Sequence, residues 1–103
     1  MRSARVFFEN DHAGLLTESE EGKEFRFQYD PGYSSFPISL TMPVRDEAYL
    51  FDEFPPFFDG LLPEGFQLEA LLRQKKLDRN DKFGQLLIIG LDTVGAVTVK
   101  EAS

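Results

Sequence analysis

The stretch Glu24-Phe25-Arg26-Phe27-Gln28-Tyr29 decides the class of fold. Phe25, Phe27 and Tyr29 occupy every second position, and charged or amide side chains fill the positions between them. Alternation with period two places the aromatic side chains on one face of a strand and the polar ones on the other, which is typical of an antiparallel sheet with one covered face. We therefore expect a half-buried strand over residues 24–29.

Further strands are predicted on both sides of this stretch. Residues 5–9 and 15–18 are rich in apolar and β-branched side chains, and turn-forming residues fill positions 10–14 between them. A shorter alternation over residues 38–42 lies between two prolines and predicts an edge strand. Residues 95–100 resemble a closing strand.

The second half of the chain changes to helical spacing. Pro55-Pro56 can open a helix, because amides of the first turn have no intrahelical acceptor. The apolar stripe of this helix, which Pro63 ends, consists of Phe57, Phe58, Leu61 and Leu62. A second helix is predicted over about residues 64–76, with Leu68, Leu71 and Leu72 directed inward.

A third helix is expected to begin at a cap formed by Asn80 or Asp81 and to end at Gly90. Strands, then helices, then one closing strand predict an α+β fold. In this fold a small antiparallel sheet carries about three short helices packed on one face. At 103 residues the chain is expected to form a single domain spanning residues 1–103.

Composition narrows the function classes. The chain has no cysteine, one histidine, a net charge of −7 and no apolar run of about 20 residues. We therefore expect a cytoplasmic protein without disulfides or a membrane span, and without direct binding to nucleic acid. The basic stretch at residues 73–82 is interpreted as a solvated helix end, and His12 beside Asp11 as a solvated hairpin tip. No phosphate loop, metal-ligand set or nucleophile–base pair is present, so we expect no enzyme, cofactor or metal.

One aromatic residue stands apart from the predicted core. On an ideal helix Phe66 lies about 160° from Leu68 and 140° from Leu71, after a break at Pro63 and Gly65. An aromatic side chain displaced from the apolar stripe can serve as an interface anchor. The alternative is that the loop folds Phe66 back into the core. The predicted partner-binding residues are Glu64, Gly65, Phe66, Gln67 and Glu69.

Several segments together resemble the N-terminal subdomain of HipA-type serine/threonine kinases. Residues 57–65 (Phe-Phe-Asp-Gly-Leu-Leu-Pro-Glu-Gly) are similar to the family's "FFxNLLPE" signature, and residues 83–97 to its "DxFxLLxxIGxDxxGAV" run. Residues 6–16 resemble its first hairpin and residues 37–43 its "PLSLSLP" strand. The nucleotide loop and catalytic aspartate of the family lie further along than this resemblance reaches.

The resemblance implies a non-catalytic function. In some toxin–antitoxin operons this subdomain is encoded separately as a HipS-like antitoxin, beside a shortened HipT-like kinase toxin and a HipB-like DNA-binding protein. The expected function is therefore an antitoxin that binds and inhibits a HipT-like kinase, with a HipB-like protein as a third component of the complex. The alternative is the N-terminal structural subdomain of a full-length HipA-like kinase.

Overall fold

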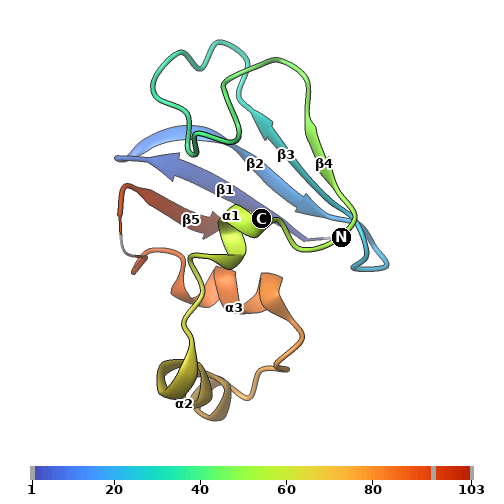
Figure 1. Ribbon diagram of the computed structural model, residues 1–103, viewed down its shortest axis with the longest axis vertical. Coiled ribbons are helices and arrows are strands. Elements are labelled where there is room, and N and C mark those ends of the chain that lie inside the picture. Colours follow the sequence, from blue (N-terminus) through green and yellow to red (C-terminus); the bar gives the residue numbers. More distant parts are fainter. Residues whose placement is uncertain (1, 94, 103) are drawn as a thin grey trace.

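The computed structural model describes residues 2–93 and 95–102. Within these residues the elements are β1 (Ser3–Phe8), β2 (Asp11–Glu18), β3 (Phe25–Tyr29), β4 (Tyr49–Phe51), α1 (Pro56–Asp59), α2 (Gly65–Lys75), α3 (Lys82–Ile89) and β5 (Val97–Glu101). The strands form one antiparallel sheet in the order β4-β3-β2-β1-β5, with the helices on one side of it (Figure 1). This confirms the predicted α+β fold.

The core lies between the inner face of the sheet and the helices α1 and α3. Phe25, Phe27 and Tyr29 of β3 are buried as their alternation predicts. Phe58 of α1 packs against Phe27, with ring centroids 5.9 Å apart, and Phe83 of α3 stacks on Phe25 at 6.4 Å. Burying one such side chain contributes roughly 1.5–3 kcal/mol, so these aromatic contacts hold α1 and α3 to the sheet.

The first hairpin turns earlier than the sequence predicts. Its turn is Glu9-Asn10, where both residues have positive φ (48° and 77°), and residues 11–14 belong to β2. Val6 faces Gly14 and Phe7 faces His12, which leaves Ala13 as the extra residue of a β-bulge. A two-residue turn with positive φ matches the twist of the strands better than the longer loop that was expected. His12 accordingly lies within β2 and not at the hairpin tip.

The prediction of an edge strand over residues 38–42 is wrong. The Met42 amide donates to the Ser39 carbonyl over 3.1 Å, so the chain makes a tight turn here, and Leu40 at its tip is 96% exposed. The Tyr29 hydroxyl donates to the Met42 carbonyl over 2.5 Å and accepts from the Ile38 amide over 3.0 Å. An extended segment could not bring both of its ends to one hydroxyl. The edge strand is instead β4, which was not predicted.

The helical stripe of residues 57–62 is confirmed in outline. The helix itself is a single turn, in which Phe58 is fully buried, and Leu62 is buried just beyond it. Phe57 and Leu61 are only half-buried against the same core. Pro63 then separates this turn from α2, as predicted.

The helix α3 is held at both ends. Its N-cap is Asp81, whose carboxylate accepts from the Gly84 amide over 3.1 Å. At its other end Gly90 lies directly against β5. A Cβ atom on Gly90 would be only 2.1 Å from the Val99 carbonyl oxygen. Only glycine fits this approach, so α3 and β5 are fixed closely together.

Candidate partner-binding site

The helix α2 stands outside the core. None of its residues is buried, and its leucines Leu68, Leu71 and Leu72 are only half-buried. It lies at the end of the molecule far from the sheet (Figure 1). A helix that contributes so little to the core exposes most of its surface, so α2 is the candidate binding surface.

The backbone before α2 determines how Phe66 is presented. Glu64 is extended, with φ −130° and ψ 165°, and Gly65 has φ +58°, a conformation that glycine adopts at little cost. Gly65 is the first residue of α2, and Phe66 follows it in the first turn and is 95% exposed. The alternative that the loop returns Phe66 to the core is therefore wrong.

A hollow of about 340 Å³ lies beside Phe66. It is lined by Gly65, Phe66, Leu68, Glu69 and Arg79. Glu69 accepts a hydrogen bond from the Arg79 guanidinium over 2.5 Å, and both side chains are about half-exposed. An exposed pair of this kind contributes about 0–1 kcal/mol, so its main effect is to tie α2 to the connection that leads to α3.

Gln67 faces a different surface. With Leu71 and Lys75 it lines a groove of about 520 Å³ between α2 and the end of α3, where Ile88 and Ile89 form the other wall. The structure thus brings three predicted site residues, Gly65, Phe66 and Glu69, to one hollow. It places Gln67 on the other flank of α2 and leaves Glu64 exposed at its N-terminus.

Two residues of the hollow were not predicted. Leu68 was assigned to the inward stripe, but it is half-buried and lines the hollow. Arg79 lies ten positions beyond Glu69, and the only sequence signal linking them is their opposite charge. Helical spacing relates residues three or four apart, so it could not reveal a contact closed by the turn after α2.

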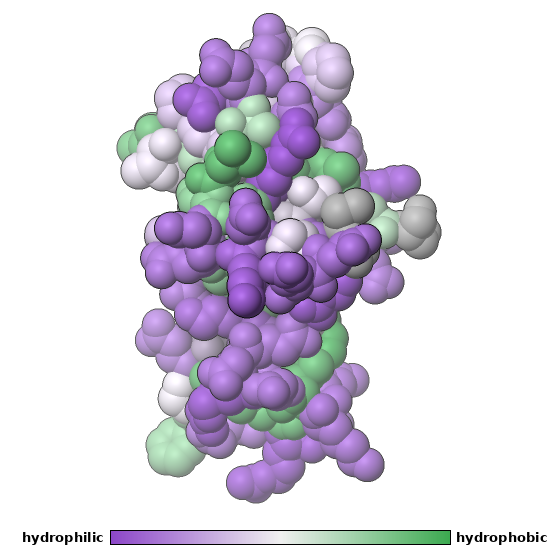
Figure 2. Space-filling view, turned by 90° about the vertical axis from the view of Figure 1, so that its right-hand side faces the viewer, coloured by the Kyte–Doolittle hydropathy of each residue, from purple (hydrophilic) through white to green (hydrophobic). Residues whose placement is uncertain are grey.

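The surface around α2 mixes hydrophilic and apolar side chains. Figure 2 shows apolar groups among hydrophilic ones at the end of the molecule where α2 lies. In the basic stretch of residues 73–82, Arg79 pairs with Glu69 and Lys82 pairs with Asp59 over 3.3 Å. The pairing reduces the positive charge that this stretch offers to a phosphate backbone.

The described residues contain no group of three histidine or acidic side chains that could hold a metal ion. His12 hydrogen-bonds through Nδ1 to the Asp30 carboxylate, on the sheet and remote from α2. No helix in the described part of the chain is long and apolar enough to cross a bilayer.

The chain folds as a small α+β domain whose exposed helix α2 lies outside the core. The family model of the HipA N-terminal domain matches residues 4–100. The chain belongs to this family, as the sequence motifs had indicated. A solved structure described as the N-terminal domain of HipA toxin covers 100% of this chain and is itself covered to 94%, with a TM-score of 0.77 and 30% identity.

The matched domain makes up very different shares of its relatives' chains. An uncharacterized protein of Haemophilus influenzae is 35% identical over 98% of this chain and 93% of its own length. The putative kinase Y4mE of Sinorhizobium fredii is 28% identical over 94% of this chain, which spans only 24% of the kinase. A Shewanella oneidensis complex of HipA, HipB and operator DNA matches 94% of this chain and 23% of the solved chain, with a TM-score of 0.74 and 25% identity.

Proposed function

We propose that the protein is an antitoxin that binds a HipT-like serine/threonine kinase through α2 and inhibits it, without chemistry of its own. The observation that carries the proposal is Phe66, an aromatic side chain that is 95% exposed on a helix outside the core. Large aromatic residues that fold into no core are frequent anchors of protein interfaces. Membership of the HipA N-terminal domain family supports a kinase as the partner.

The contact we propose is insertion of the Phe66 ring into a cleft of the kinase. Gly65, Leu68 and the ion pair of Glu69 with Arg79 line the hollow beside the ring and would form the edge of the contact. Glu64 is exposed beside it and Gln67 lies on the other flank, so both would contribute polar contacts at the rim. A ring that fills the cleft would exclude a substrate sterically.

The acidic character of the chain would assist this encounter. The net charge is −7, and a kinase cleft receives the phosphates of a nucleotide. A positive cleft would attract an acidic partner over distances of about 10 Å at 0.1 M salt, which raises the association rate.

The further elements of the proposal follow from the family. The domain over residues 1–103 would act in the cytoplasm, without a cofactor or direct contact with nucleic acid. A HipB-like DNA-binding protein would join the complex, as HipA and HipB occur together with operator DNA in the Shewanella structure.

A second candidate function also has an observation in its favour. Y4mE and the Shewanella HipA chain contain the matched region as about a quarter of their length. The same domain could therefore be the N-terminal structural part of a HipA-like kinase, packed on the catalytic part of its own chain. The length of the natural reading frame distinguishes the two functions, because only the second requires the catalytic part of a kinase to follow.

A growth experiment tests the antitoxin function. We expect cells that express the HipT-like kinase encoded beside this gene to stop growing, and co-expression of this chain to restore growth. The Phe66→Ala variant should fail to restore growth, whereas Leu40→Ala should restore it, because Leu40 is equally exposed, at 96%, but lies far from α2. Growth arrest that the unmodified chain does not relieve would refute the proposal.

A further inference from the structure

The outer face of the sheet, opposite the helices, carries basic side chains although the chain as a whole is acidic. The register of the strands fixes which side chains point there, because Ala4, Val6, Leu16, Phe27 and Val99 are buried and their neighbours alternate outward. The outward positions are Ser3, Arg5, Phe7, His12, Leu15, Thr17, Arg26, Gln28, Leu50, Thr98 and Lys100. No outward position of the described strands holds a carboxylate.

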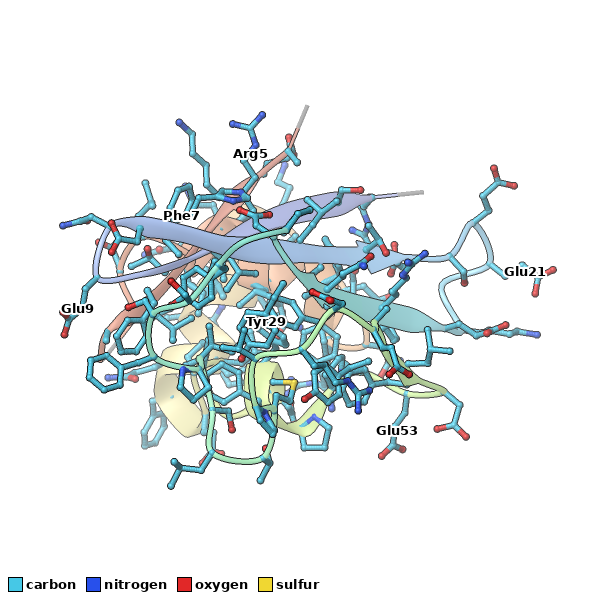
Figure 3. All side chains as sticks on the ribbon, turned by 90° about the horizontal axis from the view of Figure 1, so that it is seen from above. Arg5, Phe7, Glu9, Glu21, Tyr29 and Glu53 are labelled. Carbon is cyan, nitrogen blue, oxygen red and sulfur yellow. The ribbon has the colours of Figure 1, made fainter. Side chains whose placement is uncertain are left out.

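This is unexpected in a chain with 18 acidic and 11 basic residues. Arg5, Arg26 and Lys100 are all exposed, and none of them has an ion-pair partner among the described residues. The one carboxylate bonded on this face is that of Asp30, which reaches His12 from the loop after β3. In Figure 3 Arg5 projects from the side of the sheet opposite α1 and α2, and Glu9, Glu21 and Glu53 lie at the periphery.

Two of the three cations lie directly opposite each other. Arg5 of β1 faces Lys100 of β5 in the antiparallel register. Like charges at paired positions of a sheet destabilise it, and an acidic residue at either position would give a favourable pair instead. The folding of the isolated chain therefore gains nothing from this arrangement.

Apolar side chains are interleaved with these cations. Leu15 neighbours Arg5 across β1 and β2, and Leu50 neighbours Arg26 across β3 and β4. Leu15 is 36% exposed and Leu50 is 77% exposed. Arginine is one of the residue types that are enriched at protein interfaces.

We propose that this outer sheet face, formed by Arg5, Leu15, Arg26, Leu50 and Lys100, binds an acidic segment of a second protein. The three cations would pair with carboxylates, and the two leucines would contact an apolar residue between them. A phosphate backbone is the less favoured occupant, because it offers no apolar side chain to the two leucines, and its higher charge density would be repelled more strongly by the rest of this acidic chain. Since α2 lies on the other side of the sheet, this contact would leave the kinase-binding surface accessible.

A defined peptide tests the proposal. The ¹⁵N-labelled protein is titrated with a 12-residue peptide of alternating Glu and Ser with one central Leu, in low salt and then in 0.5 M NaCl. We expect amide shifts confined to the outward positions of the strands and lost in high salt, because contacts between exposed charges are screened. A peptide with Lys in place of Glu should cause none of these shifts.

The variant Lys100→Glu separates binding from folding. It should weaken the peptide complex about tenfold, because it replaces an attraction with a repulsion. It should also raise the melting temperature by about 1–6 °C, because Arg5 gains an oppositely charged neighbour. Arg73→Glu, which alters a basic residue of α2, should leave peptide binding unchanged, and Arg5→Gln supplies a second weakening variant.

The other outcomes overturn the proposal. Absence of shifts at millimolar peptide, or shifts centred on α2, would show that the outer face is only a solvated surface. Tighter binding to a 20-base-pair DNA duplex than to the peptide would assign the face to nucleic acid instead. Unaltered peptide binding by both Lys100→Glu and Arg5→Gln would exclude the cations as its contacts.

Discussion

Arg2 joins the start of the chain to the start of α3. Its guanidinium donates to the Glu18 carboxylate over 2.7 and 2.9 Å and to the Asp81 carboxylate over 2.7 and 3.2 Å. It also lies over the Phe83 ring, 5.1 Å from its centroid. Hydrogen bonding to Arg2 holds the pKa of Asp81 below its ordinary value, despite the opposing effect of partial burial. Because Asp81 also caps α3, one carboxylate connects the helix to β1 and β2 through Arg2.

This lowered pKa makes stability depend on pH in the acid range. A carboxyl group with a lower pKa in the folded state contributes stability above its unfolded pKa of about 3.9, and loses it as the pH falls through the folded pKa. Asp81→Asn keeps a capping side chain but removes the charge, so it should cost up to about 1 kcal/mol at pH 7. Melting curves from pH 7 to pH 2 should show the difference between wild type and variant shrinking below about pH 4.

Asp46→Asn is the control, since Asp46 is exposed and its side chain has no bond to another described residue. It should leave the melting temperature unchanged throughout. A constant difference between wild type and Asp81→Asn down to pH 2 would mean that the charge of Asp81 does not act through Arg2.

Single residues also explain why the turn of the first hairpin lies earlier than its composition predicts. Turn composition suggested a loop over residues 10–14, but Glu9 and Asn10 adopt positive φ and close the hairpin in two residues. Asparagine tolerates this conformation, whereas glutamate gives no sequence signal for it. The side-chain pattern of residues 11–14 is further obscured by the bulge at Ala13, which shifts the alternation by one position.

At the scale of elements, the packing of α1 against the sheet depends more on the ring of Phe58 than on that of Phe57. Phe58 is fully buried against Phe27, whereas Phe57 is half-buried at the edge of the core. Phe58→Ala should therefore lower the free energy of unfolding by about 3–5 kcal/mol, and Phe57→Ala by clearly less. Urea unfolding of both variants measures this directly. Equal losses would place both rings equally deep in the core.

The helix α2 is expected to be the least protected element. It buries no residue, so its opening exposes little apolar surface and costs little free energy. Native-state hydrogen exchange should show its amides exchanging faster than those of β1 and β2 in the centre of the sheet. Protection of α2 equal to that of these strands would contradict its placement outside the core.

The elements with a clear local pattern of side chains were predicted best. The alternation of residues 24–29 and the cap at Asp81 gave β3 and α3 correctly, because each rests on a local pattern. Residues 38–42 also alternate, but they turn, since both ends of the segment bond the Tyr29 hydroxyl. The three-residue strand β4 is recognisable only from its pairing with β3, a contact between distant parts of the sequence.

At the scale of the whole molecule, the two proposed surfaces lie on opposite sides. The molecule measures 40 × 29 × 25 Å, and α2 lies at one end of its longest axis. The outer sheet face is turned away from the helices and carries exposed cations on an acidic protein. This arrangement would allow the chain to bind the kinase and an acidic protein at the same time.

The sequence revealed part of the candidate site. Phe66 could be singled out because its position on an ideal helix lies away from the leucine stripe, which is a local property of the sequence. Its exposure of 95% in the structure agrees with this position. Gln67 was grouped with Phe66 by proximity in sequence, yet it lines the groove on the other flank of α2. The contribution of Arg79 depends on how the chain returns after α2, which only the three-dimensional structure shows.

The most direct measurement is the affinity of the HipT-like kinase for three forms of this chain, determined by calorimetry. Truncating a central aromatic anchor costs about 2–4 kcal/mol, so Phe66→Ala should bind roughly 30- to 1,000-fold more weakly with an unchanged melting temperature. Leu40→Ala should bind as the wild type does. Binding by Phe66→Ala within about threefold of wild type, at equal stability, would contradict the claim that Phe66 anchors the kinase.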